Sequence, residues 1–388
     1  MNLHIKTLTA AVVAALAMTA AQAADLQPYS HKGQVLQRLS AFDNPEGAIF
    51  SADGKYVFIS NAAEQGNPEK GFSWTRGAGY VSKLEVQKDG TLKVVDEKLI
   101  TGLTAPLGFA VNPVGTKKFP KGTIFLVQAT APLAEADGTP VKSVQGLNPK
   151  ITAFDVDGKV LGEIKLGAGS AAEKAAGVIA TLGNALAFDQ SGNLYVAETG
   201  IAGASFEPPL PTKGGGIYLL PHGALDDLAD GKDAKISYLP VPEGGPDGIE
   251  VAPDGGIHFN TVGIAGGLKD PAEGGQYAVS KKDIESGKLP APFGKGFGAL
   301  DGLDFAGEVR LDTEIKNTSS VVVTPAKGKA YILTYEQDTK LAGPADIAVR
   351  KQSDGSYLLV IPELNATSPN KKDNTVTVVK LPKGFDRP

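Results

Sequence analysis

Residues 246–263 read PDGIEVAPDGGIHFNTVG, and the pattern in this stretch recurs along the chain. A polar residue and a small one precede an alternating apolar strand, a glycine-containing turn and a second apolar strand. Further copies lie at 45–61 (PEGAIFSADGKYVFISN), 106–130 (PLGFAVNPVG…GTIFLVQAT) and 183–200 (GNALAFDQSGNLYVAETG). In all four copies the residue that heads the first strand precedes the turn glycine by eight positions. A fifth copy at 300–315 has a shorter turn, and a sixth at 344–364 has a longer one.

The copies are spaced widely enough for two further strands in each unit, such as 215–223 and 235–241. Six repeats of a four-stranded antiparallel sheet are typical of a β-propeller. We therefore predict an all-β fold, a six-bladed β-propeller with four antiparallel strands per blade. A pair of β-sandwich domains and a solenoid are the alternatives.

The two ends of the chain can close such a ring. Residues 374–382 (NTVTVVKLP) supply a strand of the last blade, and residues 34–40 (QVLQRLS) can supply its outer strand. Residues 170–180 can form a short helix inside a loop, with Ser170 as its N-cap.

The first 23 residues have the features of a secretory signal peptide. Lys6 supplies the positive charge, residues 8–21 form an apolar stretch too short to span a bilayer, and Ala21-Gln22-Ala23 is a small-residue cleavage site. We predict that residues 1–23 are removed near Ala23 and that residues 24–388 form a single propeller domain. The mature protein is then periplasmic or secreted.

Composition narrows the classes of partner and chemistry. The chain has 38 Lys and Arg against 43 Asp and Glu, a formal net charge of −5, without a basic run. Nucleic acid and membrane insertion are therefore not expected. The chain has no cysteine, which excludes disulfides, thiolate nucleophiles and cysteine-liganded metals.

Long insertions fall on one face of the predicted propeller. The start of each first strand and the loop after each second strand share a face, and on that face lie 62–79, 131–149, 201–214 and 264–276. We expect these loops to build a rim around the central opening, where a protein partner would also bind, unless they are tolerated decoration. Trp74, beside Arg76, either lines a pocket there or pins its own loop.

The residues that head the first strands should meet at the axis. They are Glu46, Leu107, Asn184, Asp247, Asp301 and Ala345. Carboxylates brought together repel each other unless a cation lies between them. We predict that Glu46, Asn184, Asp247 and Asp301 bind one divalent metal, and their hard oxygen donors favour Ca²⁺ over Mg²⁺ or Mn²⁺. Alternatively, each of these residues only caps a turn.

Two polar residues of the fourth repeat, Asp254 and His258, are not predicted to bind the metal. Asp254, in the second Pro-Asp-Gly of 246–255, aligns with the turn residues of the other blades and is read as a turn residue. His258 lies mid-strand and is read as core or edge. The three histidines of the mature chain show no metal-binding spacing, so a histidine-rich zinc site is not expected.

The copies at 45–61 and 183–200 and the stretch 245–256 (GPDGIEVAPDGG) resemble blades of the senescence marker protein/gluconolactonase family, also called regucalcin-like. This family belongs to the superfamily of calcium-dependent lactonases and phosphotriesterases. The resemblance extends loosely over 32–382 and implies that Glu46, Asn184 and Asp247 hold one divalent metal. It also implies that the metal polarises a lactone or ester carbonyl, with Asp247 as ligand and catalytic base.

One departure from the family bears on activity. The family often has an asparagine in the second blade, where this chain has Leu107, and Asp301 can compensate from another blade. We therefore predict an exported metal-dependent hydrolase that takes a small lactone or ester. The alternative is a non-enzymatic propeller that binds a ligand or a protein and uses a structural calcium ion.

Overall fold

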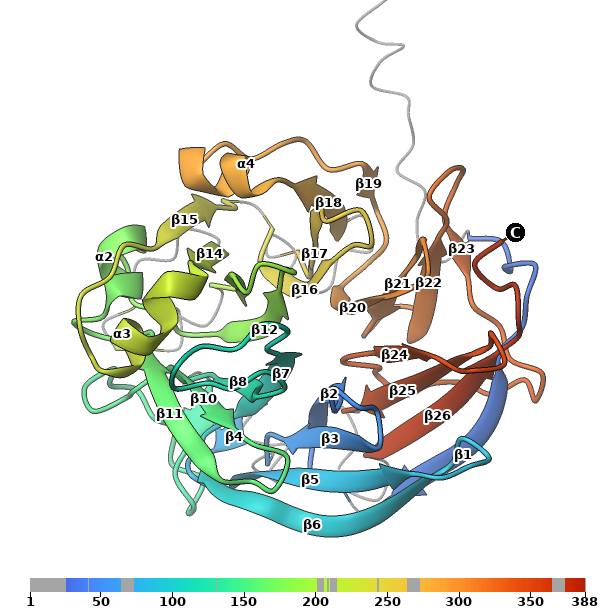
Figure 1. Ribbon diagram of the computed structural model, residues 1–388, viewed down its shortest axis with the longest axis horizontal. Helices are drawn as coiled ribbons and strands as arrows, with labels where there is room; N and C mark the ends of the chain where they lie inside the picture. Colours follow the sequence, from blue (N-terminus) through green and yellow to red (C-terminus); the bar gives the residue numbers. More distant parts are fainter. Residues whose placement is uncertain are drawn as a thin grey trace, which may run out of the picture.

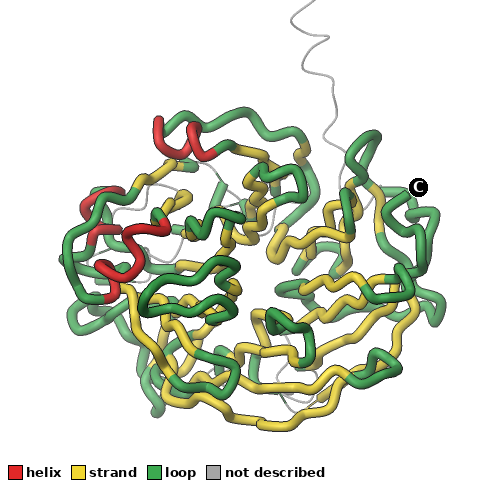
Figure 2. The backbone as a smooth tube through the Cα atoms, in the orientation of Figure 1, coloured by secondary structure: helices red, strands yellow, loops and turns green. Residues whose placement is uncertain are grey.

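The computed structural model describes residues 26–40, 42–63, 73–130, 132–200, 206–207, 209, 215–242, 244–263, 273–364 and 374–387. Six four-stranded antiparallel sheets stand around a central axis, as Figure 1 and the backbone tube of Figure 2 show. The predicted six-bladed β-propeller is therefore confirmed. The predicted signal peptide lies outside the described residues.

Each blade contributes one strand to each of four concentric positions. The inner strands are β2 (Pro45–Phe50), β7 (Pro106–Val111), β12 (Gly183–Phe188), β16 (Pro246–Val251), β20 (Leu300–Ala306) and β24 (Ala348–Lys351). The second strands are β3 (Tyr56–Asn61), β8 (Ile124–Gln128), β13 (Leu194–Glu198), β17 (Ile257–Thr261), β21 (Val309–Glu314) and β25 (Tyr357–Glu363).

The third and outer strands complete the sheets. The third strands are β5 (Gly79–Val86), β10 (Lys150–Phe154), β14 (Gly216–Leu220), β18 (Gly275–Val279), β22 (Ser320–Thr324) and β26 (Thr375–Leu381). The outer strands are β6 (Leu92–Leu103), β11 (Val160–Lys165), β15 (Ser237–Pro240), β19 (Gly294–Lys295), β23 (Tyr331–Ile332) and β1 (Gln34–Ser40).

The sixth blade closes the ring with strands from both ends of the chain. Its order is β1-β26-β25-β24, and β1 pairs antiparallel with β26 from Gln34 opposite Lys380 to Ser40 opposite Thr375. This pairing, visible at the right of Figure 1, is the closure expected from residues 34–40. It fixes the last blade to the chain start without a disulfide.

Short helices and one further strand pair lie outside the blades. The helices are α2 (Ala171–Ala176), η4 (His222–Ala224), α3 (Leu225–Ala229) and α4 (Lys281–Ser286). The Ser170 hydroxyl accepts a hydrogen bond from the Glu173 backbone N–H, which confirms the predicted cap of α2. Strands β4 (Trp74–Thr75) and β9 (Leu133–Ala134) pair in parallel. Among the described residues, no helix has the length and apolar character that a membrane span requires.

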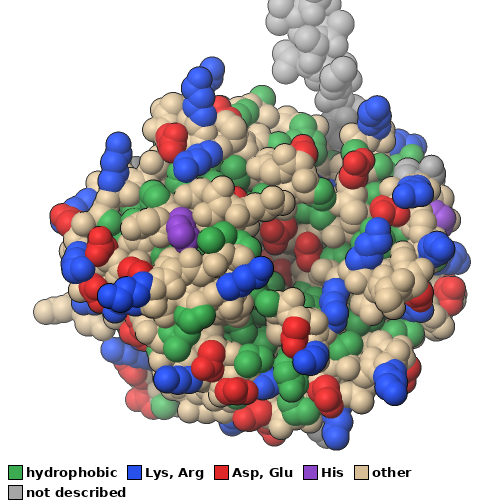
Figure 3. Space-filling model, in the orientation of Figure 1, with side chains coloured by type: hydrophobic (Ala, Val, Ile, Leu, Met, Phe, Trp, Pro, Cys, Tyr) green, Lys and Arg blue, Asp and Glu red, His purple; other side chains and the backbone are tan. Residues whose placement is uncertain are grey.

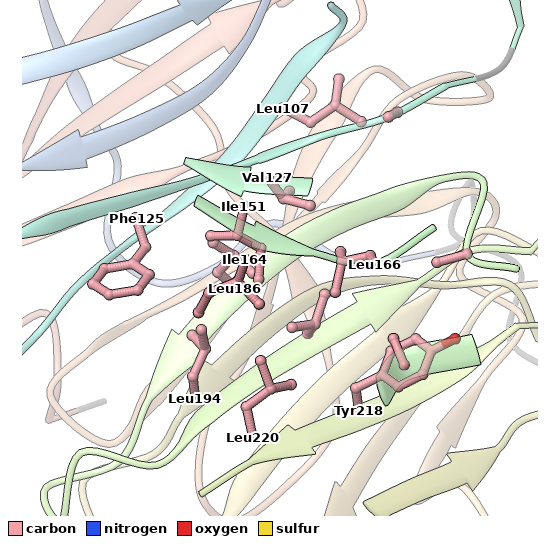
Figure 4. Packing of buried hydrophobic residues seen from close by; sticks show 14 of the residues in the cluster. Leu107, Phe125, Val127, Ile151, Ile164, Leu166, Leu186, Leu194, Tyr218 and Leu220 are labelled. Carbon is pink, nitrogen blue, oxygen red and sulfur yellow. The ribbon is translucent and has the colours of Figure 1, made fainter. Parts of the chain in front are cut away.

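Apolar side chains pack mainly between neighbouring blades. Figure 4 shows the largest of these clusters, which joins blades 2 and 3 through residues such as Phe125, Ile151 and Leu194. Leu107, the head of β7, belongs to this cluster and is fully buried. It therefore fills the core beside the axis, and the axial wall of blade 2 carries no oxygen-bearing side chain at this level.

Candidate metal centre at the propeller axis

A β-bulge near the start of five inner strands determines where the side chain of the strand-head residue (the residue eight positions before the turn glycine, or its equivalent) points. In each of β2, β7, β12, β16 and β20, the pairing with the second strand shifts after the first residue, as it does between Pro246 and Ile249. Such a bulge re-aims the residues that it contains. The head residue and its small neighbour fall within the shift, so the repeat turns the same position towards the axis in several blades.

Side chains of the second strands hold these bulges in place across the blade boundaries. Asn260 accepts the Gly248 N–H at 2.8 Å and donates to the Gly302 carbonyl of the next blade at 3.2 Å. Thr313 likewise accepts the Gly302 N–H at 2.7 Å and donates to the Ala345 carbonyl at 3.2 Å. The backbone that carries Asp247 and Asp301 is thus fixed by hydrogen bonds to its own blade and to its neighbour.

The same device operates at the other two predicted ligands. Ser60 accepts the N–H of Gly47, next to Glu46, at 2.7 Å and donates to the Leu107 carbonyl at 2.7 Å. Thr199 donates to the Pro246 carbonyl at 2.9 Å and accepts the Asn184 side-chain N–H at 3.4 Å. Because the amide nitrogen of Asn184 binds Thr199, its carbonyl oxygen remains free to act as a ligand.

The four predicted ligands line one small cavity at the axis. Glu46, Asn184, Asp247 and Asp301 surround a space of about 10 Å³, together with Ala345, Asp346 and backbone of the inner strands. This volume matches a single water-sized particle. The structure therefore brings together all four residues proposed from the sequence, and Figure 3 shows acidic side chains around the hollow at the centre of the ring.

Two carboxylate oxygens at this cavity lack hydrogen-bond partners within the described part of the chain. Glu46 is 5% exposed and Asp247 is 4% exposed, yet Glu46 Oε2 and Asp247 Oδ1 are each buried without a partner. A buried polar atom without a partner is costly and requires a reason. Asp247 also shares a side-chain hydrogen bond with Asp301, which implies a proton between the two carboxyl groups.

The electrostatics of the cavity favour a cation. Burial raises the pKa of Glu46 well above its usual range, and the charges of Asp247 and Asp346 raise it further. Burial also raises the pKa values of Asp247 and Asp301. Among the residues that the structure describes, no Lys, Arg or His lines the cavity. Protons or a cation must therefore neutralise these carboxylates.

The donor set suits a hard divalent cation, but it is not a finished coordination shell. Among the described residues, no group of three or more Asp, Glu, His or Cys side chains is arranged to hold a metal ion. The predicted set includes the amide of Asn184, and the Asp247–Asp301 pair is closed by its shared hydrogen bond. A cation would displace that proton, because metal binding and protonation compete for the same oxygens.

The structure adds three acidic residues that the sequence reading did not select. Asp346 borders both the axial cavity and a second cavity of about 30 Å³ further along the channel, which Glu250 and Asp304 also line. Burial raises the pKa of Asp346 to about 6 and that of Glu250 to about 7. Glu250 and Asp304 each lie three residues beyond a strand head, where the other blades have Ile or Ala, and this contrast was the available signal.

Trp74, Arg76 and His258, which the sequence also singled out, contact other side chains and do not line the axial cavity. Trp74 is 5% exposed, and its indole N–H donates to Asn44 Oδ1 at 2.7 Å, so it pins its own loop. Arg76 pairs with Glu135 at 3.2 Å. His258 lies away from the axis between Phe293 and Phe305, and burial and Arg310 lower its pKa to about 4. Most of the predicted rim at 62–79, 201–214 and 264–276 falls outside the described residues.

Comparisons with known proteins support the fold. No family model matches the chain, and no curated protein matches it in sequence. A solved structure described as a gluconolactonase has a TM-score of 0.53 at 12% identity, covering 92% of this chain and 94% of its own. A gluconolactonase from Xanthomonas campestris scores 0.50 at 15% identity, covering 92% and 97%. An oxidoreductase described as a glucose dehydrogenase, from Thermus thermophilus, scores 0.51 at 13% identity, covering 91% and 100%.

At these identities the comparisons establish a shared propeller architecture. The chemistry of this chain has to be argued from its own axial residues.

Proposed function

We propose that this protein is an exported metal-dependent hydrolase of small lactones or related esters. One divalent cation, Ca²⁺ by the character of the donors, would be held by Glu46, Asn184, Asp247 and Asp301. The observation that carries the proposal is the pair of buried, unpartnered oxygens of Glu46 and Asp247 at one cavity without a basic residue. Oxidoreductase and gluconolactonase neighbours share the scaffold. Hydrolysis would need only the metal and a water, whereas oxidation would also require an electron acceptor.

A bound cation would polarise the substrate carbonyl and lower the pKa of the attacking water. Asp247 would accept a proton from that water, as the resemblance implies, and its buried Oδ1 has no hydrogen-bond partner among the described residues. Asp301 is its hydrogen-bond partner in the metal-free protein and would become a ligand once the cation displaces their shared proton. Asn184 would offer its side-chain carbonyl oxygen to the ion, since its amide nitrogen donates to Thr199.

The substrate would approach from the face on which the inner strands begin. The second strands end on this face, as the pairing of Pro45 with Asn61 and of Gly183 with Glu198 shows. The loops that follow the second strands therefore start beside the axial cavity. A cavity that admits one water-sized particle leaves room for the ion, while the reacting carbonyl would lie above it on the face where the inner strands begin.

Metal analysis and hydrolysis assays test this function directly. The mature protein should contain one divalent ion per chain, and Ca²⁺ should raise the melting temperature of EDTA-treated protein; at 100 times Kd the gain is about 2.7 kcal/mol. The loaded protein should hydrolyse members of a panel of aldonolactones and aryl esters. Hydrolysis that survives removal of the metal would overturn the proposal.

A second function has its own supporting observation. Leu107 is fully buried in the apolar core, so blade 2 offers no polar group to a substrate at the level where the family often has an asparagine. A protein that binds Ca²⁺ with a gain in stability, but hydrolyses no member of the panel, would be a binding propeller with a structural ion. Its ligand or protein partner would then bind on the loop-rich face.

A further inference from the structure

Blade 6 breaks a rule that the other five blades follow at the axis. The residue after the strand head is small in the other blades: Gly47, Gly108, Ala185, Gly248 and Gly302. In blade 6, Pro344 pairs with Glu363 as Pro45 pairs with Asn61 in blade 1. Asp346 therefore occupies the place of these small residues.

Close contact between inner strands explains the small residues. A Cβ on Gly47 would lie 2.3 Å from the Leu107 carbonyl oxygen, and one on Gly248 would lie 2.3 Å from the Asp301 carbonyl oxygen. Neither distance is tolerable, so these blades meet backbone to backbone. Between blades 6 and 1 a carboxylate side chain fits instead, and Asp346 Oδ2 accepts the Ala48 N–H of blade 1 at 2.9 Å.

Asp346 thereby lies between the candidate metal centre and the second cavity of the channel, and it lines both. It borders the same 10 Å³ cavity as the unpartnered oxygens of Glu46 and Asp247. Its charge also acts on Glu46, Asp247 and Asp301, and it is a cause of the raised pKa of each. Bonds to the backbone N–H groups of Ala48 and Ile347 do not require a full negative charge in a cavity already rich in carboxylates.

We propose that Asp346 is an additional protein ligand of the axial divalent cation, delivered by blade 6 where blade 2 offers none. This inference rests on the proposed metal centre and concerns a residue that the strand-head pattern does not contain. Ca²⁺ takes six to eight oxygens, and its affinity rises with the number of charged ligands. With Asp346, the site has four carboxylates and one amide from five blades.

Asp304 provides a matched control. It too is a carboxylate that bridges two blades, since its Oδ2 accepts the Val349 N–H of blade 6 at 2.6 Å. It lines the second cavity and does not line the axial one. Substituting Asp304 therefore changes the charge of the channel and an inter-blade hydrogen bond while it leaves the axial donors in place.

The experiment is calorimetric titration of Ca²⁺ into EDTA-treated mature protein, with the melting temperature of each apoprotein recorded. Asp346→Asn keeps an acceptor for the Ala48 N–H and should weaken Ca²⁺ binding by about 10- to 100-fold, without lowering the apoprotein's melting temperature. Asp304→Asn should change the affinity by less than about threefold. Asp346→Gly, which installs the residue of four other blades, should show the same loss of affinity as Asp346→Asn.

The possible results separate this inference from the proposed function. Wild-type affinity in either folded Asp346 variant would overturn the role of Asp346 while it leaves the metal centre standing. Equal weakening by Asp346→Asn and Asp304→Asn would also overturn it, because a general field effect would then suffice. Absence of Ca²⁺ binding by the wild-type protein would overturn both proposals.

Discussion

Two sets of buried carboxylates lie on the same face of this propeller and differ in their hydrogen-bond partners. Glu314, at the end of β21, accepts backbone N–H groups from Ala299 and from residues 316–319. Glu363, at the end of β25, accepts from Arg38, the Ala342 N–H and two threonine hydroxyls. At the start of the inner strands, Glu46 and Asp247 retain oxygens without any partner.

The difference separates structural carboxylates from functional candidates. Both sets are buried, and both recur at equivalent positions in the blades. Glu198, at the end of β13, belongs to the strand-end set by position, but its Oε2 has no partner among the described residues, so the contrast holds between Glu314 and Glu363 on one side and Glu46 and Asp247 on the other. A carboxylate whose lone pairs are filled by backbone N–H groups stabilises a loop and has little capacity left for a ligand. A buried carboxylate with an empty lone pair is stable only if a proton or a cation supplies the missing partner.

The largest expected effect comes from the axial set. Asp247→Asn should lower hydrolysis by the metal-loaded protein by about 10²- to 10⁴-fold, because it removes the proposed base and a charged ligand. The EDTA-treated variant should be at least as stable as the EDTA-treated wild type, since one of the repelling carboxylates is gone. Initial rates on the substrate panel and urea unfolding measure the two effects; a variant of unchanged activity would disprove the role of Asp247.

The opposite result is expected for a carboxylate at the end of a second strand, where a substitution should lower stability and leave metal binding unchanged. Glu314→Gln places an amide N–H₂ against backbone donors of the loop after β21, and we expect it to lower the free energy of unfolding by about 2–4 kcal/mol. Metal affinity of the folded fraction should stay at the wild-type level. Urea unfolding and Ca²⁺ titration check this, and loss of affinity with full stability would reverse the distinction between the two sets.

The repeat made much of this site predictable. A fixed spacing between strand head and turn glycine placed Glu46, Asn184, Asp247 and Asp301 on one ring, and the structure gathers them at one cavity. The same alignment assigned Ala345 to the ring as the head of blade 6, but it did not include the next residue, Asp346. Asp346 was missed although it stands in a column of glycine and alanine, because close approach of neighbouring inner strands is visible only in three dimensions.

Burial was the other feature that the pattern could not supply. Leu107 occupies a head position by spacing, but its side chain is packed in the core of blades 2 and 3. The partners of each carboxylate were equally hidden, since Asn260 and Thr313 contact the bulges from a neighbouring strand and across a blade boundary. Residue type and spacing located the oxygens, and tertiary contacts decide which of them remain free.

The channel carboxylates should also make the metal-free protein less stable at higher pH. In the folded state burial raises the pKa of Asp346 to about 6 and that of Glu250 to about 7, from ordinary values of 3.8 and 4.5. The folded protein thus holds these protons more tightly than the unfolded chain. Their stabilising effect is complete below about pH 4 and is lost as the pH rises through 6 and 7.

We therefore expect the free energy of unfolding of EDTA-treated protein to fall by about 1–3 kcal/mol between pH 5.5 and pH 8.0. Urea unfolding at the two pH values measures this. The double variant Asp346→Asn, Glu250→Gln serves as the control and should reduce the dependence, while the raised pKa values of Glu46, Asp247 and Asp301 account for what remains. Equal or greater stability at pH 8.0 for the wild type would show that these groups are solvated in the apoprotein.

The smallest effect is expected at the second Pro-Asp-Gly. Asp254 is exposed, its Oδ1 accepts the Gly256 N–H at 2.9 Å, and Gly255 has a φ of +87°. Asparagine keeps the accepting oxygen and is well tolerated in such turns. Asp254→Asn should thus change stability by less than about 0.5 kcal/mol and leave Ca²⁺ affinity and hydrolysis at wild-type levels.

Because Asp247→Asn makes the same chemical change in the same tripeptide seven residues earlier, only position in the fold distinguishes the two variants. If both lost metal binding, loss of negative charge anywhere on blade 4 would explain the result, and the unpartnered oxygen of Asp247 would no longer single out the axial site.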